Sequence, residues 1–562
     1  MPPTSTRELS IDRLLLGLIC LSATTVAVLF VYFWQPYFNS DYAMIGLIAK
    51  RILTTGRFPI FIPNAGYQGL LLEGSAVALG FKLFGISART LNLAPAVFFA
   101  PLLYSFYLFN RDWFPKRQAL LTTLLIIIAT PALYERILRT QPNYSECFTL
   151  GFFSLHLYAL ALRDQRKSLR IHGILFALGV LLGFGMYTYG QTVFFLLTMG
   201  AHLSLPYFYG RFEKYKGVAR LTPWGGPLAK LFSILLICFF GISIAALVFV
   251  PKESRLNPAA WLALATALFV IGHLVASWSR LVTKWKNAAL VAPGFLVGFS
   301  PKIYDHLVEH GRSAAKFGVN GKLPHFLDRL KWVCQITSHY FGATETGYLI
   351  AVPSLTLILF SVFFFSKSEI RRPSPHLILP VFVLGLFCFS SEAIDLPSAR
   401  YTILILFFFS TALSYTLCKI FSGDGPKIRL ATSAFAAVFF LTSLHSFYRL
   451  FADAPALGQS WSEVASWIEQ RGVSRGYAGY WQAYAITYLT NEKIELEPVM
   501  TAYLPYYEKD VGMAKRIAYV SDSERAIRPT AGGDTLTIRG ENFKVEEKTV
   551  IHGMETYILE RL

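Results

Sequence analysis

The chain has 562 residues, of which 54% are hydrophobic and only 15% are charged. Soluble globular proteins carry nearer ~25% charged residues, so the composition excludes an ordinary soluble domain and indicates a polytopic membrane protein. The formal net charge of +18 does not indicate a nucleic-acid partner, because the basic residues recur in short loops between apolar stretches and do not form one patch.

The first apolar stretch, Leu14 to Trp34, is long enough to span a membrane and lacks a small-residue cleavage site, so we expect an uncleaved signal anchor. A span needs ~20 apolar residues, and thirteen stretches approach that length. We therefore expect about 13 transmembrane helices. Their approximate positions are 14–35, 90–109, 118–134, 145–162, 171–187, 190–209, 229–250, 258–279, 287–300, 347–366, 374–391, 401–418 and 429–447.

Basic residues fix the expected orientation. If the N-terminus is cytoplasmic, six consecutive inside loops are strongly basic, as the positive-inside rule requires. This assignment holds only if residues 70–86, which contain Glu73 and Lys82, form a second helix lying in the outer interface and do not cross. The absence of eukaryotic sorting signals favours a bacterial inner membrane.

The chain divides into two expected domains. Residues 1–450 form a transmembrane catalytic domain, with a first outer loop over 36–89 and a second outside segment over 301–346. Residues 451–562 turn soluble in composition and predict a small α/β domain on the outer face. That segment opens with a helical pattern, WSEVASWIEQRG, and continues with short alternating runs such as AKRIAYVSD, DTLTIRG and KTVIHGMETYILERL.

Six cysteines are scattered along the chain without a CxxC pair, so we expect small buried hydrophobic residues and no metal or disulfide framework from them. They are Cys20, Cys147, Cys238, Cys334, Cys388 and Cys418.

Asp41 stands at the start of the first outer loop and opens a helical pattern, DYAMIGLIAKRILTT. Ser40 is the expected N-cap and Gly56 the expected stop. The helix has a broad apolar face, while Lys50 and Arg51 are expected to face lipid headgroups. Ionisable groups at a membrane boundary are usually paired, solvated or functional, so Asp41 is a candidate catalytic carboxylate. Alternatively, it only stabilises the helix N-terminus through the dipole.

Two more carboxylates, Glu73 and Glu146, stand at span ends on the same side. A carboxylate cluster can deprotonate a hydroxyl or hold a divalent cation, although each residue alone is equally typical of a solvated loop charge. Arginine binds phosphate bidentately, which makes Arg139 and Arg400 candidates; Arg136 is more typical of a snorkelling anchor.

The glycine-rich P-loop, HExxH, GxSxG and the Rossmann GxGxxG are absent from the sequence, so no docking site for a cytosolic nucleotide is visible. An activated donor would therefore come from the membrane. Tyrosines at a comparable depth, such as Tyr401, are typical of an interfacial belt, while Tyr67 lies beside a glycine in a loop and is a better ligand candidate.

The first outer loop resembles that of the GT-C glycosyltransferases, closest to the lipopolysaccharide galacturonosyltransferase-like branch related to the protein O-mannosyltransferases of glycosyltransferase family 39. Further resemblances are NYSECFTLGFFSL, GFLVGFSPKIYDHL, the Arg400–Tyr401 pair and the tail segment RGYAGYWQAYAITYLTNEKI. The matching loop positions are Asp41, Ala43, Gly46, Leu47, Ala49, Ile52, Leu53, Gly56, Pro59, Phe61, Tyr67, Gly69, Glu73, Phe84, Gly85 and Ser87.

The sequence also departs from that pattern. Two leucines shift Glu73 by one residue, and Asp305 or His306 stands where the branch has asparagine. The aminoarabinose-transferase branch has a lysine in this loop that the chain lacks, so that donor chemistry is not expected to transfer directly.

The resemblance implies a GT-C fold and transfer of a sugar from a polyprenyl-phosphate donor to an acceptor glycan, lipid or protein on the outer face, with inversion. The residues fit that chemistry, with Asp41 as the group that deprotonates or orients the acceptor hydroxyl. Glu146, together with Asp41, is the expected holder of a divalent cation such as Mg²⁺ or Mn²⁺. Phosphate would bind to Arg139 and Arg400. The expected sugar or acceptor contacts are Tyr67, Glu73 and Tyr401.

The leading alternative is a lipid-linked glycan transporter or a polysaccharide polymerase. A transporter should place ionisable residues near the midplane of several spans or show broken helices in matching halves. The expected spans are nearly free of charge, and the charged groups gather at one surface. This distribution favours chemistry at the interface; a purely structural scaffold would not need the Asp41 loop.

Overall fold

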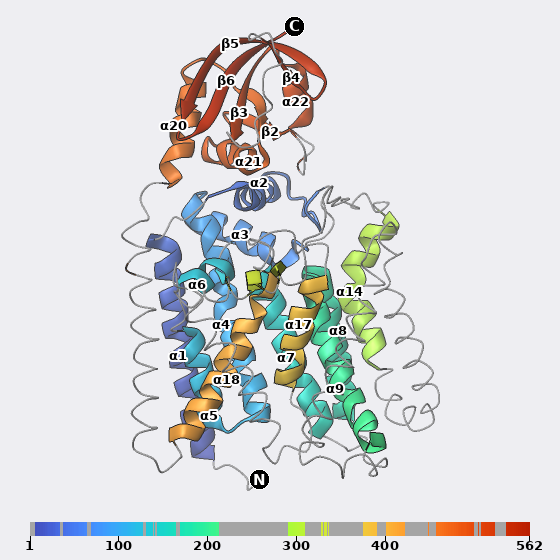
Figure 1. Cartoon of the computed structure of the whole chain (residues 1–562). Helices are drawn as coiled ribbons and strands as arrows, with labels where there is room; N and C mark the ends of the chain where they lie inside the picture. The colour runs from blue at the N-terminus through green and yellow to red at the C-terminus, as the bar shows by residue number, and fades with distance from the viewer. Residues whose placement is uncertain are drawn as a thin grey trace.

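A bundle of helices carries a mixed sheet above one end, with the N-terminus at the opposite end (Figure 1). The computed structural model describes residues 6–33, 38–63, 69–127, 131–138, 140, 143–163, 169–212, 290–308, 328–329, 331–333, 335, 375–389, 401–421, 448, 457–499, 504, 507–522 and 535–562. The spans expected near 229–250, 258–279, 347–366 and 429–447 lie outside these residues.

Most of the other expected spans are helices. Among the described residues, three helices are both long and apolar enough to cross a membrane, namely α4 (Ala88–Trp113), α7 (Tyr144–Arg163) and α8 (Leu169–Thr188). Together they support a polytopic membrane protein. The other long bundle helices are α1 (Thr6–Phe33), α9 (Thr192–Phe212), α14 (Val291–Val308), α17 (Pro375–Phe389) and α18 (Leu404–Phe421).

Two boundaries differ from expectation. The stretch expected as one span over 118–134 contains α5 (Lys116–Ile127) and α6 (Pro131–Ile137), with proline at the first helical position where its missing N–H costs nothing. The segment expected to leave the membrane at residue 301 continues as helix α14 through Pro301 to Val308. Membrane helices tolerate an internal proline when neighbouring groups satisfy the freed carbonyl.

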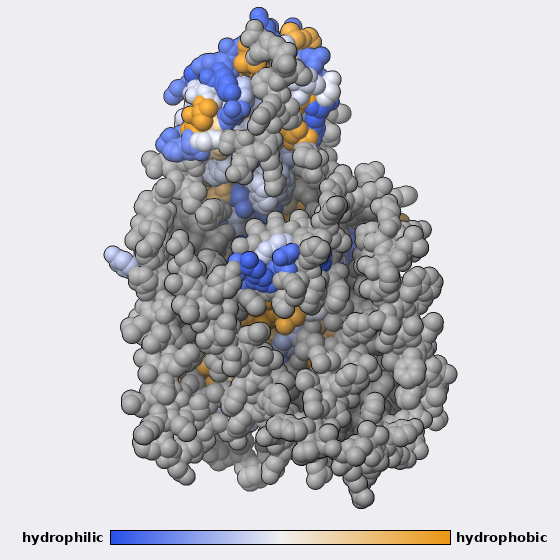
Figure 2. Space-filling view, in the orientation of Figure 1, coloured by the Kyte–Doolittle hydropathy of each residue, from blue (hydrophilic) through white to orange (hydrophobic). Residues whose placement is uncertain are grey.

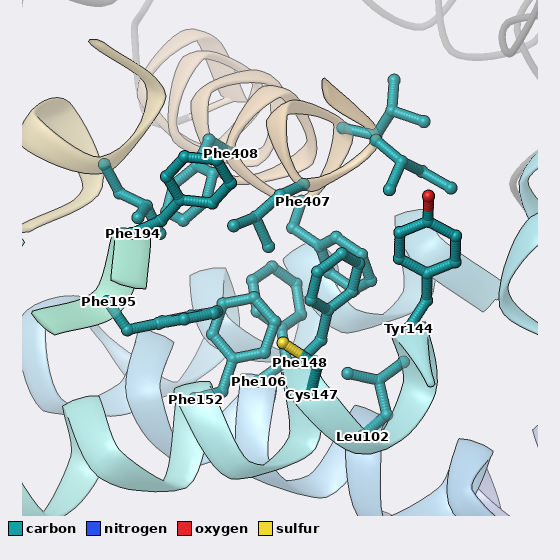
Figure 3. Packing of buried hydrophobic residues seen from close by; sticks show 14 of the residues in the cluster. Leu102, Phe106, Tyr144, Cys147, Phe148, Phe152, Phe194, Phe195, Phe407 and Phe408 are labelled. Carbon is teal, nitrogen blue, oxygen red and sulfur yellow. The ribbon is translucent and has the colours of Figure 1, made fainter. Parts of the chain in front are cut away.

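Interlocked aromatic rings fill the centre of the bundle (Figure 3). Phe152 of α7 lies 4.9 Å from Phe106 of α4 and 5.3 Å from Phe407 of α18, measured between ring centroids. Phe195 of α9 meets Phe152 edge-on at 5.5 Å. Offset and edge-to-face pairs at such distances are favourable beyond their buried area, so this cluster ties four helices together beneath the candidate site.

Helices α8 and α14 pack through facing glycines, two on each helix at a spacing of four residues. A Cβ added at Gly183 would lie 2.1 Å from the carbonyl oxygen of Phe295, and one at Gly298 would lie 2.1 Å from that of Val180. Close approach of backbones through small residues is a recurrent way for membrane helices to associate, because lipid removes the hydrophobic drive for association.

We expect Gly183→Val to lower the free energy of unfolding by about 1–3 kcal/mol, because the side chain forces the two helices apart. Gly173→Val is the matched control on the same helix, since a Cβ there meets nothing within 4 Å. Thermal unfolding of the two variants in detergent measures the difference. Equal stability of both variants would show that α8 and α14 do not depend on this contact.

The described C-terminal residues form a six-stranded sheet in the order β2-β1-β3-β6-β5-β4. Strands β1 (Arg475–Ala478), β2 (Glu495–Pro498) and β3 (Arg516–Asp522) are parallel neighbours, and β6 (Met554–Arg561), β5 (Glu541–Ile551) and β4 (Thr535–Ile538) continue it antiparallel. Its helices are α20 (Leu457–Glu469), α21 (Tyr480–Leu489) and α22 (Glu508–Met513).

Both faces of this sheet are covered, as the alternation along β3 shows. Ala518 and Val520 pack into the cluster that contains residues of α20 and α21, while Ile517 and Tyr519 pack on the other face with Val511 of α22. Successive side chains of a strand point to opposite faces, so the alternating apolar pattern read from the sequence becomes two small cores. The coloured surface of this unit carries both hydrophilic and hydrophobic residues (Figure 2).

Two short helices lie between the bundle and the sheet (Figure 1). They are α2 (Ser40–Thr55) and α3 (Leu71–Phe84), which the sequence predicted as helices of the first outer loop. One apolar cluster contains Ile45 of α2, Phe81 of α3, Leu91 of α4 and Tyr488 of α21. The loop helices are therefore packed between the two layers, with the sheet unit resting on α2.

Candidate functional site

The side chain of Asn39 caps the N-terminus of helix α2. The side chain of Asn39 accepts hydrogen bonds from the backbone N–H groups of Asp41 and Tyr42, and Gly56 ends the helix in the left-handed conformation with φ of 67°. Asn39, and not Ser40, is therefore the N-cap. The prediction of Ser40 was wrong because its hydroxyl is used elsewhere: it accepts a hydrogen bond from the N–H of Tyr484 at 3.0 Å.

Asp41 lies partly buried in the first turn of α2, beneath the C-terminal unit. The hydroxyl of Tyr480 donates to Oδ1 of Asp41 at 2.5 Å. Tyr480 is the first residue of α21, so the N-termini of two helices meet at this carboxylate. The N-terminal turn of α2 favours a negative charge at Asp41, and the Tyr480 hydroxyl donates to it.

Helices α2 and α21 run parallel along their contact. Their N-termini meet at Asp41 and Tyr480, and their far ends meet where Lys50 Nζ donates to Asn491 Oδ1 at 2.8 Å. Between them, a Cβ on Gly46 would lie 2.5 Å from the ring of Tyr488, so glycine is needed for the close approach. The part of α2 from Ser40 to Lys50 is therefore an interface.

Lys50 was expected to face lipid headgroups, and that prediction is wrong. It is 6% exposed, lies 4.7 Å from the centroid of the Tyr488 ring and pairs with Glu492 at 3.4 Å. Burial lowers the pKa of Lys50 below its ordinary value, against the opposing effect of Glu492. The folded chain therefore loses the Lys50 proton more readily than the unfolded chain. The free energy of unfolding consequently rises with pH between the lowered pKa of the folded state and 10.5. Arg51, the next residue, is exposed as expected.

A second polar region lies at the same end of the bundle, where α3, α7 and α8 meet. Asn143, with φ of 43°, donates from Nδ2 to the carbonyl oxygens of Gly69 at 2.7 Å and Thr188 at 3.1 Å. The Tyr187 hydroxyl receives the N–H of Leu71 at 3.2 Å and donates to the carbonyl of Ile60. These bonds fix the first outer loop to the ends of two spans.

Glu73 and Glu146 lie close in sequence to this junction, in the first turns of α3 and α7. Both are only 2% exposed, so neither is a solvated loop charge. Oε1 of Glu146 has no hydrogen-bond partner among the described residues. A buried carboxylate is costly unless a partner compensates it, so the burial of Glu146 is unusual.

We expect Asn143→Gly to destabilise the protein by about 1–3 kcal/mol, because two buried carbonyl groups lose their donor. Glycine adopts the positive φ freely, so the variant isolates the loss of the hydrogen bonds from backbone strain. Asn143→Ala should be less stable still. Chemical or thermal unfolding checks both variants, and a wild-type value for Asn143→Gly would exclude the junction as a stabilising element.

The other predicted site residues divide into two groups. Tyr401 precedes α18, is partly buried, and its carbonyl accepts from Gln191 Nε2 at 3.1 Å, which places it beside the turn that joins α8 and α9. Tyr67, Arg139 and Arg400 lie outside the described residues.

A tyrosine contributed by the C-terminal unit was missed in the sequence. Tyr480, Tyr484 and Tyr488 recur at intervals of four, which places their side chains on one face of α21, the face that lies on α2. That spacing was visible in the tail segment. What it would contact was not, because its partners lie more than 430 residues earlier in the chain.

No protein-family model and no curated protein matches the sequence. Among solved structures, the chain is similar to ArnT from Cupriavidus metallidurans in the apo state, with 12% identity over 98% of each chain and a TM-score of 0.49. ArnT bound to undecaprenyl phosphate gives 12% identity over 99% of this chain and 98% of its own, with a TM-score of 0.47.

The archaeal oligosaccharyltransferase AglB from Archaeoglobus fulgidus, in complex with an inhibitory peptide and a dolichol-phosphate, is 15% identical over 90% of this chain and 69% of its own, with a TM-score of 0.44. At these identities and TM-scores the three matches assign no family, branch or activity to this chain.

A divalent cation held by Asp41 and Glu146 finds no support in the geometry. Nowhere in the described ranges do three or more His, Cys, Asp or Glu side chains gather in a way that could hold a metal ion. An oxygen of Asp41 accepts the hydroxyl of Tyr480, and Glu146 lies buried at the start of α7. The described residues therefore show no metal site, and the step proposed below is written without one.

Proposed function

We propose that the protein is a GT-C-type membrane glycosyltransferase that moves a sugar from a polyprenyl-phosphate donor to a hydroxyl of an acceptor glycan, lipid or protein. The observation that carries this proposal is the position of Asp41. Its carboxylate lies at the end of the bundle away from the N-terminus, in the layer between the spans and the C-terminal unit. A lipid-linked donor and an acceptor outside the membrane would meet at that depth.

The local geometry suits a general base. The carboxylate of Asp41 lies in the first turn of α2 and is held by the Tyr480 hydroxyl, so an acceptor hydroxyl brought to it would meet a carboxylate in a defined position. In the proposed step, Asp41 takes the proton of the acceptor hydroxyl while that oxygen attacks the anomeric carbon. The bond from this carbon to the phosphate oxygen breaks, and its electron pair leaves with the polyprenyl phosphate, which inverts the anomeric centre.

The other roles rest on the sequence. Arg139 and Arg400 would neutralise the departing phosphate, and Tyr67, Glu73 and Tyr401 would contact the sugar or the acceptor. Glu73 is buried at the start of α3, so its contact would require a polar group to reach into the layer beneath α2. The loops and the C-terminal unit would face the extracytoplasmic side of a bacterial inner membrane, with the N-terminus in the cytoplasm.

A donor panel tests the proposal. Purified protein in lipid nanodiscs is incubated with radiolabelled polyprenyl-phosphate sugars, with and without EDTA. Release or transfer of one labelled sugar supports the glycosyltransferase and identifies its donor. Turnover that occurs without EDTA and is lost in its presence would add a metal to the mechanism. Saturable binding of a donor without any release would favour a transporter.

A further inference from the structure

The C-terminal unit contributes more than a cover to the candidate site. We propose that Tyr480 is a positioning residue for Asp41, holding one carboxylate oxygen so that the carboxylate meets the acceptor hydroxyl in a fixed orientation. This inference rests on the proposed function, because it assigns Asp41 the role of base. It adds a residue from outside the membrane domain to the reaction.

A short hydrogen bond joins Tyr480 to Asp41. Tyr480 donates its hydroxyl to Oδ1 of Asp41 at 2.5 Å, a distance typical of a hydroxyl bound to a charged carboxylate. An ionised carboxylate has two oxygens with several acceptor sites, so the bond from Tyr480 does not exhaust its capacity to accept a proton. A phenol in this position restricts rotation of the carboxylate without supplying a competing charge.

Neighbouring rings and the sheet hold Tyr480 in place. Its ring meets Trp481 edge-on at 5.1 Å and Tyr484 edge-on at 6.4 Å, measured between centroids. Gly479 precedes it at the end of β1, and the N–H of Gly479 donates to the carbonyl of Val520 in β3. The phenol is thus attached to the first turn of a helix whose entry is bonded to the sheet.

Contacts along their length fix the register between α2 and α21. Ser40 accepts the N–H of Tyr484 one residue before Asp41, and Lys50 bonds to Asn491 at the far end. Gly46 allows the Tyr488 ring to approach between these two points. Three separate contacts along α2 therefore fix where α21 lies, and that register brings the Tyr480 hydroxyl to the carboxylate.

Tyr480→Phe tests the inference, with Tyr488→Phe as the matched control. Both changes remove one hydroxyl from the same face of α21, but the Tyr488 hydroxyl is buried without a hydrogen-bond partner within the described part of the chain. We expect Tyr480→Phe to lower kcat by about 10–100-fold with an unchanged KM for the donor, because a misaligned reacting group costs rate and not binding. Tyr488→Phe should retain the wild-type kcat.

A double variant separates positioning from a general effect on folding. If Tyr480 acts through Asp41, adding Tyr480→Phe to Asp41→Asn should cause no further loss of kcat. The inference would be overturned if Tyr480→Phe kept the wild-type kcat or changed only KM. It would also be overturned if Tyr488→Phe lost as much kcat, or if the double variant lost more than Asp41→Asn.

A measurement without turnover distinguishes failure of this inference from failure of the proposed function. 3-Fluorotyrosine is incorporated at position 480 of the full chain, and its ¹⁹F resonance is recorded with Asp41 and with Asp41→Asn. A resonance that shifts with the variant supports the contact even if no donor is turned over, in which case only the proposed function fails. A resonance that does not move would overturn the positioning role, whatever the activity.

Discussion

We expect Asp41→Asn to lower kcat for sugar transfer by on the order of 10²–10⁴-fold, the range that a general base contributes. Asparagine has nearly the same shape and keeps an oxygen that can accept from Tyr480, so the local structure should persist. It cannot take a proton from the acceptor at neutral pH. The loss should therefore be in kcat, with little change in the affinity for the donor.

Glu469→Gln is the control for this variant. It makes the same change from carboxylate to amide on an exposed residue of α20, where Glu469 pairs with Lys493 at 3.5 Å and neither side chain is buried. Kinetics of both variants in nanodiscs, with unfolding temperatures recorded in parallel, give the comparison. Similar kcat values for Asp41→Asn and Glu469→Gln would remove Asp41 from the chemistry.

Lys50→Glu should be the most destabilising of the substitutions considered, at about 3–5 kcal/mol. The change places a carboxylate in a site with 6% exposure, facing Glu492 and the ring of Tyr488, and removes the cation that pairs with Glu492. The repulsion acts between α2 and α21, so the C-terminal unit should lose its fixed position on the first outer loop.

Arg51→Glu gives the matched control, because it makes the same change of charge one residue along the helix at an exposed position. It should stay within about 0.5 kcal/mol of the wild type, as surface substitutions usually do. Thermal unfolding measures both, and proteolysis of the native proteins reports whether the C-terminal unit has detached. Equal stability of the two variants would mean that the Lys50 contact does not hold the interface.

Local patterns in the sequence predicted much of the fold correctly. The helix that begins beside Asp41 and ends at Gly56 follows from a capping region, an apolar period and a glycine that adopts positive φ. The tight turn between α8 and α9, near Gly190, follows from two adjacent apolar stretches. These features depend on residues within one or two helical turns, which is the range over which sequence patterns are informative.

The errors share one cause, which is contact between distant segments. Lys50 has the composition of a headgroup-facing residue, and it is buried only because a helix more than 430 residues later lies over it. The hydroxyl of Ser40 would serve as a cap in isolation, but the N–H of Tyr484 engages it instead. Likewise, Pro301 is a reasonable end for a span, while packing of α14 against α8 carries the helix onward.

Only part of the candidate site could be named from the sequence, because the rest depends on contacts between distant segments. Asp41 and the buried carboxylates Glu73 and Glu146 could be named from their places at helix starts. That Tyr480 reaches Asp41 depends on how the sheet unit rests on α2, and no pattern within either segment encodes that docking.

The most direct test of the central claim uses one labelled polyprenyl-phosphate sugar in nanodiscs, with binding and release measured on the same samples of wild type and Asp41→Asn. The proposed function predicts that both proteins bind the donor and that only the wild type passes its sugar to an acceptor hydroxyl. Specific binding without release by the wild type, unchanged by Asp41→Asn, would contradict it and indicate a lipid-glycan transporter or scaffold.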